Sequence, residues 1–398
     1  MSEVLAELDE ARSREPDVHG AHTFGLVYPT GREDLEALAH QVSERYLFSN
    51  ALNPLRFPEQ ARLMEDVVAS TGELLHLPAG GGGSTTAGGT ESIVMAMQVH
   101  RGRARARGVE RPTIVAPRSA HPAYAKAAHY FDMDYVQIPL DPDHRADLDA
   151  AADLVDERTA VVVASAFSYP HGVIDPVEGL AGLAQQVGAG CHVDACVGGM
   201  VLPFMERLGH ELPAWDFRVP GVTSMSCDIH KYGYVPKGAS VVLHRQPDWP
   251  GLQWFVFSDW PSGLYGSPAV AGAKSPAAVM TAWAFLQYLG EDGYTEIVRD
   301  LLETSRRIRE GFTAVPGVQV VGDPVATVMA FESDRVDLYA VGEEMERRGW
   351  FLNRNTEPRG LHVMVSPAHG ALVDALVADF AESARVAGTA ASDEARYA

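Results

Sequence analysis

The chain has little cysteine and comparatively little positive charge. Cysteine occurs three times, as Cys191, Cys196 and Cys227, and never in a Cys-x-x-Cys pair. This spacing indicates neither a zinc ribbon nor a disulfide framework, so we predict free thiols in a reducing cytosol and no metal site. Lysine and arginine number 32 against 53 aspartates and glutamates, which gives a net charge of −21. Nucleic acids and anionic membranes repel such a protein, so we expect neither as a partner.

Long apolar runs are absent as well. No stretch approaches the ~18 apolar residues that a membrane-spanning helix requires. The acidic N-terminus, MSEVLAELDEARSREPD, lacks the apolar core of a signal peptide. We therefore expect a cytoplasmic protein without a membrane span. With 398 residues, of which 46% are hydrophobic, the chain can form two or three domains, or one large α/β domain with a smaller one beside it.

The apolar pattern in the middle of the chain predicts an α/β fold. Short apolar runs alternate with helical stretches, which is typical of parallel strands covered on both faces. The runs lie at 113–117, 134–140, 160–167, 190–195, 222–227 and 239–244. After about residue 290, strands and helices predict a smaller α+β domain. The expected domains are an N-terminal helical segment at 1–58, a large α/β domain at 59–290, a small C-terminal α+β domain at 291–388 and a tail at 389–398.

A glycine-rich passage, GGGGSTTAGGTES at 80–92, precedes a predicted helix. Glycines let the backbone approach a ligand closely, and the N–H groups and dipole at the start of a helix favour an anion. The passage is not a Walker A loop, because no Gly-Lys-Ser/Thr follows, and it lacks the dinucleotide-binding glycine pattern. It predicts either a phosphate cradle or a flexible surface loop that caps a helix.

Residues near the ends of the predicted strands carry functional groups. Asp194 ends the run GCHVDA, where a carboxylate needs a cationic or hydrogen-bonding partner, or simply caps the next turn. Lys231 follows the run VTSMSC, and His230 and Lys237 nearby would lower the pKa of its amine; the alternative is a surface lysine. His121 follows the first strand and could cover a flat ring or begin a helix.

Taken as a set, these groups match one cofactor. Pyridoxal phosphate needs N–H groups for its phosphate, an acid for its ring nitrogen and an amine for its aldehyde. The glycine-rich passage, Asp194 and Lys231 supply these three functions.

The same motifs resemble the sphingosine-1-phosphate lyase branch of the group II pyridoxal-phosphate-dependent decarboxylases, which have fold type I. The resemblance runs from about Tyr28 to about Val386. It rests on the collinear motifs TAGGTESIVMA (86–96), SAHPAYAKAA (119–128), HVDACVGGMVLPF (192–204), VTSMSCDIHKYGYVPKGASVVL (222–243) and DWPSGLYGSP (259–268). It implies a large domain with a mostly parallel seven-stranded sheet between helices, plus a smaller C-terminal α+β domain.

The resemblance also implies roles for individual residues. Lys231 would form the Schiff base with pyridoxal 5'-phosphate, Asp194 would keep the ring nitrogen protonated, and His121 would stack on the ring. These three form the implied catalytic set. A homodimer with shared active sites is implied, because part of the phosphate site comes from the neighbouring subunit. The implied phosphate ligands are Gly89, Thr90 and His230 and, from that neighbour, Gly266 and Ser267.

The substrate side matches the family less well. Tyr28 and Lys237 occupy positions that in the family contact the substrate phosphate. Arg56, in NPLRFP, replaces a substrate-side histidine; an arginine can hold a phosphate or a carboxylate but cannot exchange protons as histidine does. Phe167 and Ser168 stand where the family prefers a Pro-Asn pair, which removes an amide near the cofactor.

The implied activity is retro-aldol cleavage of a carbon–carbon bond. The expected substrate is a small anionic amine, a phosphorylated 2-amino-3-hydroxy compound like a sphingoid base, and the products are an aldehyde and phosphoethanolamine. One alternative is an amino-acid decarboxylase, or another carbon–carbon bond enzyme, in which Arg56 holds a carboxylate. The other is a non-enzymatic cofactor-binding protein, against which the presence of both Asp194 and Lys231 argues.

Overall fold

The structure, a computed structural model, describes residues 1–17 and 19–387, so the expected tail at 389–398 lies outside the described residues. The chain forms two compact units. The larger comprises Arg32–Tyr169 and Val173–Val298, and the smaller comprises Met1–Gly31, Pro170–Gly172 and the chain from Arg299 on. This division differs from the expected sequential domains, because the segment 1–58 is shared between both units. Among the described residues, no helix combines the length and apolar character needed to cross a bilayer.

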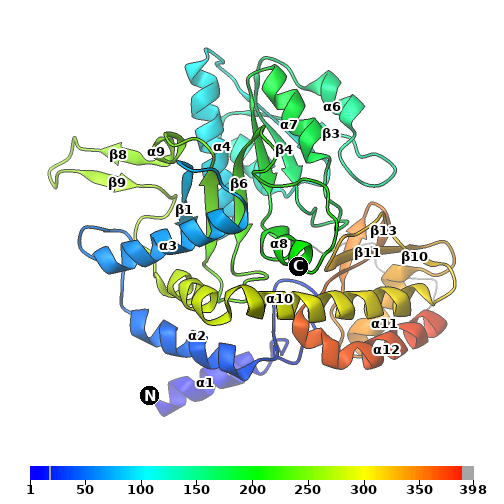
Figure 1. Cartoon of the computed structure of the whole chain (residues 1–398). Helices are drawn as coiled ribbons and strands as arrows, with labels where there is room; N and C mark the ends of the chain where they lie inside the picture. Colours follow the sequence, from blue (N-terminus) through cyan, green and yellow to red (C-terminus); the bar gives the residue numbers. More distant parts are fainter. Residues whose placement is uncertain (18, 388–398) are drawn as a thin grey trace. The chain divides into compact units, whose positions relative to one another are not determined.

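A seven-stranded sheet forms the centre of the larger unit (Figure 1), in the order β1-β7-β6-β5-β4-β2-β3. Strand β7 runs antiparallel to both of its neighbours, and the other neighbouring pairs are parallel. The expected mostly parallel sheet of seven strands is therefore confirmed. The strands are β1 (Gly82–Thr86), β2 (Thr113–Pro117), β3 (Asp134–Ile138), β4 (Thr159–Ser165), β5 (Gly190–Asp194), β6 (Val222–Asp228) and β7 (Ser240–His244).

Burial explains why the central strands could be predicted and β1 could not. Every residue of β4 and β5 is buried, and the central residues of β4, AVVVA, form a continuous apolar run. Strand β1 has the sequence GGSTT, without an apolar residue, and forms because all five residues pair with β7. A Cβ atom on Gly83 would lie 2.0 Å from the carbonyl oxygen of Val242, so only glycine fits at this position.

Helices cover the sheet of the larger unit. Helix α4 and α5 pack on it through a core that joins Met97 and Tyr124 to Val161 and Val163 of β4. Helix α10 is kinked at Gly290, where φ is 56°, and it runs across the expected domain boundary at residue 290. The helices are α2 (Glu33–Tyr46), α3 (Pro58–Leu74), α4 (Gly89–Ala106), α5 (Ala123–Phe131), α6 (Leu148–Leu154), α7 (Val177–Gln186), η1 (Gly198–Met200), α8 (Leu202–Arg207), α9 (Trp249–Gln253) and α10 (Ala277–Thr313).

A two-stranded hairpin projects from the larger unit next to α9 (Figure 1). It consists of β8 (Phe255–Phe257) and β9 (Tyr265–Ser267), which pair antiparallel. Phe255, Val256 and Leu264 are exposed on it. An exposed apolar cluster of this kind is typical of a surface that contacts another molecule.

The smaller unit contains a four-stranded antiparallel sheet in the order β10-β11-β13-β12. The first residues of the chain belong to it because Phe24 docks there: its N–H group donates to the carbonyl oxygen of Phe351 (3.0 Å), and its ring stacks on His369 with centroids 4.0 Å apart. The elements are α1 (Ser2–Arg12), β10 (Val318–Val320), β11 (Val328–Ser333), α11 (Leu338–Arg347), β12 (Asn353–Thr356), β13 (Arg359–Met364), η2 (Pro367–Leu372) and α12 (Val373–Val386).

Candidate functional site

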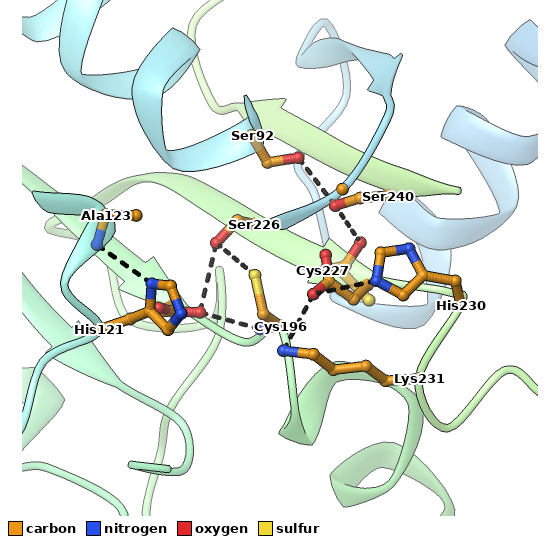
Figure 2. Close-up of polar contacts among 12 residues, drawn as sticks. Ser92, His121, Ala123, Cys196, Ser226, Cys227, His230, Lys231 and Ser240 are labelled. Carbon is orange, nitrogen blue, oxygen red and sulfur yellow. Dashed lines mark hydrogen bonds and ion pairs between the residues drawn. The ribbon is translucent and has the colours of Figure 1, made fainter. Parts of the chain in front are cut away.

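The candidate site lies at the carboxyl ends of the parallel strands in the larger unit. Asp194 is the last residue of β5 and Asp228 is the last residue of β6. His121 follows β2, and Lys231 follows β6 by three residues. Parallel strands end at the same edge of a sheet, which is where open α/β sheets bind ligands. Figure 2 shows that the side chains of His121 and Lys231 point toward each other across this edge.

An ion pair joins the lysine to a buried carboxylate. The Nζ atom of Lys231 lies 3.0 Å from Oδ2 of Asp228, whose side chain is 2% exposed. The Nε2 atom of His230 lies 3.8 Å from the same oxygen. Burial alone would raise the pKa of Asp228, but the positive charge of Lys231 and, in acid, that of protonated His230 outweigh it and hold this pKa below its ordinary value. Burial lowers the pKa of His230 to about 4, so at neutral pH this ring is uncharged.

Asp194 is held through one carboxylate oxygen. Its Oδ1 atom accepts hydrogen bonds from the N–H group of Cys196 (3.0 Å) and from the hydroxyl group of Ser226 (3.5 Å). The strand register places Asp194 directly opposite Ser226 on β6. The carboxylate is nearly buried yet keeps a fixed orientation, which suits a group that must face a ring nitrogen.

His121 presents a neutral aromatic ring. Its Nδ1 atom accepts a hydrogen bond from the N–H group of Ala123 (3.1 Å), so the proton of the neutral ring is on Nε2. Burial lowers the pKa of His121, and the charges of Asp194 and Lys231 act on it in opposite directions. A flat uncharged ring at this place can stack on another ring.

The glycine-rich passage forms a close-fitting wall of the site. Helix α4 begins at Gly89, where a Cβ atom would lie 2.6 Å from Oδ2 of Asp228 and 2.9 Å from Sγ of Cys196. Thr90 is exposed in the first turn of this helix. The Nδ1 atom of His230 and the Oδ1 atom of Asp228 are buried, and no described residue offers either of them a hydrogen bond.

This donor set fits pyridoxal phosphate. The N–H groups of the first turn of α4 and the unpartnered Nδ1 of His230 can donate to a phosphate group. The carboxylate of Asp194 can pair with a ring nitrogen, and the amine of Lys231 can bind an aldehyde. Glycine at 89 leaves the space that any side chain would fill.

Of the remaining expected residues, Lys237 lies at this site and the others lie elsewhere. The side chain of Lys237 is exposed, and its Nζ donates to the carbonyl oxygen of His230 (3.4 Å). The surrounding protein and the charge of Lys231 lower the pKa of Lys237 to about 8. Arg56 is exposed in a loop, where its N–H group bonds Asn53. Tyr28 belongs to the smaller unit, where its hydroxyl group donates to the Met364 sulfur (3.0 Å).

Ser267 and Gly266 lie at the end of strand β9 in the hairpin. Ser267 is buried, and its hydroxyl group donates to the carbonyl oxygen of Ala269 (3.0 Å). Gly266 lies near the Trp254 ring, which a Cβ atom at this position would approach to 3.4 Å. Both residues are held by contacts within the same subunit, since each also pairs with β8.

Asp228 is a residue of the site that the sequence reasoning missed. The signal that drew attention to Asp194, a carboxylate at the end of a buried apolar run, is present at Asp228 as well. It also precedes Lys231 by three residues. The two residues that depart from the family pattern, Phe167 and Ser168, are both buried, so this difference lies in the packed interior.

Comparisons with known proteins identify the family. Residues 26–333 match the family model of the pyridoxal-dependent decarboxylase conserved domain. The sphingosine-1-phosphate lyase of Dictyostelium discoideum is 37% identical over 384 residues, which cover 96% of this chain and 71% of that protein. The Arabidopsis thaliana enzyme of the same name is 38% identical over 389 residues, with 96% and 71% coverage.

Solved structures agree with this result. A sphingosine-1-phosphate lyase from Burkholderia pseudomallei superposes with a TM-score of 0.92 at 37% identity and covers 97% of this chain and 91% of that one. A glutamate decarboxylase from Lactobacillus brevis, at 22% identity, has a TM-score of 0.84, with 97% and 92% coverage, and shares the fold. The expected fold type I is thus confirmed. The chain is a pyridoxal-phosphate-dependent lyase and belongs to the sphingosine-1-phosphate lyase family within the pyridoxal-dependent decarboxylases.

Proposed function

We propose that the protein cleaves the bond between C2 and C3 of a phosphorylated 2-amino-3-hydroxyalkane and releases an aldehyde and phosphoethanolamine. One observation carries this proposal. A lysine amine, a fixed carboxylate and a neutral imidazole lie together at the sheet edge, in a chain that is 37% identical to a sphingosine-1-phosphate lyase. When bound, pyridoxal phosphate supplies a protonated ring that accepts the electron pair left by the broken bond.

The residues of the chain divide the remaining tasks. Lys231 would hold the cofactor through its amine, Asp194 through the ring nitrogen and His121 by covering the ring face. Gly89, Thr90 and His230 would bind the cofactor phosphate. Cleavage removes a proton from the 3-hydroxyl group and returns one to C2; Lys231 is the proton carrier that we assign to this exchange, because its charge is already controlled by Asp228 at 3.0 Å.

The substrate phosphate needs its own cations. Lys237 carries a positive charge below about pH 8 and lies next to the His230 backbone. Arg56 is exposed with its guanidinium group available for a bidentate contact, and Tyr28 offers a phenol. We assign these three residues to the substrate phosphate. A local basic group can bind an anion although the whole chain carries a net charge of −21, because salt screens distant charges.

Product analysis tests the proposed reaction. Cofactor-loaded protein is incubated with long-chain and short-chain 2-amino-3-hydroxyalkyl phosphates and, separately, with a panel of amino acids. The expected products are an aldehyde and phosphoethanolamine, detected by mass spectrometry, and the consumed substrate reveals the preferred chain length. Amines lighter than the amino acids by one carbon dioxide, without any aldehyde, would refute retro-aldol cleavage and indicate a decarboxylase. Lys231→Ala is the control and should lose at least ~10³-fold in turnover.

The active form that we propose is a homodimer with shared sites. The exposed apolar cluster on the β8–β9 hairpin, formed by Phe255, Val256 and Leu264, suits burial against a second copy. Gly266 and Ser267 at the end of β9 would then reach the partner's cofactor phosphate. Sedimentation should give a dimer, and Phe255→Glu should shift it toward monomer. Mixing inactive Lys231→Ala with inactive Ser267→Asp should restore activity, because each hybrid dimer contains one intact site; no recovery would contradict shared sites.

We also propose a reducing cytoplasm as the compartment. Cys191, Cys196 and Cys227 are buried free thiols. Burial raises the pKa of Cys191 to about 12, which keeps this thiol protonated and unreactive. Fractionation of the source cells should recover the protein with cytoplasmic markers, and a mobility-shift assay should show no binding to nucleic acid.

A further inference from the structure

A row of buried polar side chains runs across the sheet toward Asp194. His192 and Asp194 are two residues apart and therefore lie on the same face of β5, and Ser224 and Ser226 occupy the matching positions of β6. The register pairs His192 with Ser224 and Asp194 with Ser226. His100 enters from α4, which covers this face. His100, His192, Ser224 and Ser226 are all fully buried.

Hydrogen-bond distances connect these side chains into a continuous series. The Nε2 atom of His100 lies 2.8 Å from the hydroxyl oxygen of Ser224, and the Nδ1 atom of His192 lies 2.8 Å from the same oxygen. The Nε2 atom of His192 lies 3.3 Å from the hydroxyl oxygen of Ser226, which lies 3.5 Å from Oδ1 of Asp194. We call these five residues the buried hydrogen-bond chain.

His100, at the far end of the buried hydrogen-bond chain, fixes the direction in which its hydrogen bonds are donated. The Nδ1 atom of His100 is buried, and no described residue is within hydrogen-bonding distance of it. A buried N–H group without an acceptor is rarer and more costly than an unfilled acceptor, so the proton of neutral His100 is on Nε2. His100 then donates to Ser224, whose own hydrogen goes to Nδ1 of His192. The proton of His192 is therefore on Nε2 and points to Ser226.

The near end of the chain agrees with this direction. The Ser226 oxygen accepts from Nε2 of His192 and from the thiol of Cys196, whose Sγ lies 3.3 Å away. Both of its acceptor positions are then filled, and its single hydrogen is left for the Asp194 carboxylate, which can only accept. Burial lowers the pKa of His192 to about 4 and the pKa of His100 well below its ordinary value, so both rings are neutral.

We propose that the buried hydrogen-bond chain orients the Asp194 carboxylate toward a cofactor ring nitrogen and, by donating to Oδ1, favours the state in which the shared proton stays on that nitrogen. This inference rests on the proposed function, in which Asp194 faces the ring. His100, Ser224, His192 and Ser226 are then positioning residues that act through Asp194. Each donor along this series strengthens the next, so Ser226 holds Oδ1 of Asp194 more firmly than an isolated hydroxyl group would.

The packing around His100 shows that its place is specific. A Cβ atom on Gly190 would lie 2.3 Å from Cε1 of His100 and 2.8 Å from Oγ1 of Thr223. Gly190 lies two residues before His192 on the same face of β5, so the absence of a side chain there makes room for the imidazole.

The first test measures the histidine tautomers in the cofactor-free protein. Nitrogen-15 NMR distinguishes an Nε2–H ring from an Nδ1–H ring and from a protonated ring. We expect neutral Nε2–H rings at both His100 and His192. An Nδ1–H ring at His192 would overturn the proposal, since its bare Nε2 atom would then accept the Ser226 hydrogen that the series directs to Asp194. This measurement does not depend on cofactor binding.

The second test reads the ring nitrogen directly in the loaded protein. Pyridoxal phosphate labelled with nitrogen-15 at the ring reports its protonation through the chemical shift, measured as a function of pH. Without the Ser226 donor, part of the shared proton should move from the ring nitrogen to the Asp194 carboxylate. The nitrogen-15 shift at pH 7 should therefore move toward the value of an unprotonated ring in Ser226→Ala, and by less in Ser224→Ala. These are small substitutions, and thermal unfolding of each variant verifies that it folds.

His244→Gln is the matched control. His244 is a buried neutral histidine on the neighbouring strand β7, and its Nε2 atom bonds Gln253 (3.2 Å) outside the chain. The substitution His244→Gln should leave the protonation of the cofactor ring nitrogen unchanged. Equal shifts in Ser226→Ala and His244→Gln would overturn the proposal. If the unsubstituted protein does not bind pyridoxal phosphate at all, the proposed function is refuted. The histidine tautomers still decide whether the buried hydrogen-bond chain is present.

Discussion

Lys231 and Asp228 form an ion pair at the carboxyl end of strand β6, with Nζ of the lysine 3.0 Å from Oδ2 of the aspartate. The aspartate is 2% exposed and its second oxygen has no hydrogen-bond partner among the described residues. A carboxylate at this distance favours the ammonium form of the amine. An amine must lose its proton before it can attack an aldehyde, so this contact sets a condition on cofactor capture.

Asp228→Asn should accelerate cofactor capture at pH 7 by roughly tenfold, because an amide does not stabilise the ammonium form as a carboxylate does. Stopped-flow absorbance of the imine follows the reaction. Asp216→Asn is a suitable control, since Asp216 is an equally buried carboxylate that pairs instead with Arg218 (2.8 Å). Slower capture by a folded Asp228→Asn protein would show that the carboxylate assists the attack, contrary to this prediction.

Gly89→Ala should weaken binding of pyridoxal phosphate. Its Cβ atom would lie 2.6 Å from Oδ2 of Asp228, and overpacking of this kind costs about 1–3 kcal/mol. The dissociation constant should rise about 10- to 100-fold, as measured by fluorescence titration. Gly102→Ala in the same helix meets nothing within 4 Å and should leave binding unchanged while stabilising α4 by about 0.5–1 kcal/mol. Equal binding losses in both variants would contradict the steric argument.

The affinity for a phosphorylated substrate should depend on pH through Lys237. Its pKa is lowered to about 8, so the group is charged at pH 7 and loses its charge above pH 8. The KM for a 2-amino-3-hydroxyalkyl phosphate should therefore rise between pH 7 and pH 9. Lys237→Arg keeps the charge throughout this range and should flatten the profile. A KM that rises equally in both proteins would assign the effect to another group, such as the substrate amine.

Buried His244 should make the protein sensitive to acid. Burial lowers its pKa to about 4, whereas the unfolded chain has a value near 6.5. Between these pH values the unfolded state binds a proton that the folded state does not, so the free energy of unfolding falls as pH falls. His244→Gln should remove about 2 kcal/mol of the loss between pH 7.5 and pH 5.

Urea unfolding at pH 7.5 and pH 5 gives the slope of the free energy of unfolding against pH, and this slope is compared between the unsubstituted protein and His244→Gln. Only the pH dependence is compared, because the substitution also changes packing against Trp249. His40→Gln, at an exposed histidine, serves as the control and should leave the slope unchanged. An unchanged pH dependence in His244→Gln would mean that the ring titrates with the same pKa in the folded and unfolded states, contrary to this prediction.

Much of the fold could be predicted because burial imposes a simple pattern. Strands β4 and β5 are buried at every residue, and a continuous apolar run records this directly. Strand β1 gave no such signal, since glycine, serine and threonine form it at the sheet edge through pairing with β7. The hairpin strands β8 and β9 also escaped prediction, because each has only three residues and too short an alternation of apolar and polar side chains to be recognised.

The site was predictable to the extent that chemistry follows strand ends. Asp194 and Lys231 could be found from the runs that precede them, and Asp228 could have been found by the same rule. His100 could not. Its position on α4 gains meaning only from the space at Gly190 and from the register of β5 and β6, and neither is visible before the chain is folded.

The position of strand β7 has a consequence for biosynthesis. The segment that would hold the cofactor phosphate follows β1, the first strand to be synthesised, whereas the lysine follows β6, and β7 is the strand that joins the two in the sheet. A nascent chain that has not yet reached His244 therefore lacks a complete cofactor pocket, however much of its sheet has formed. The cofactor then binds finished molecules, and its stabilisation of them grows with the logarithm of its free concentration over its dissociation constant.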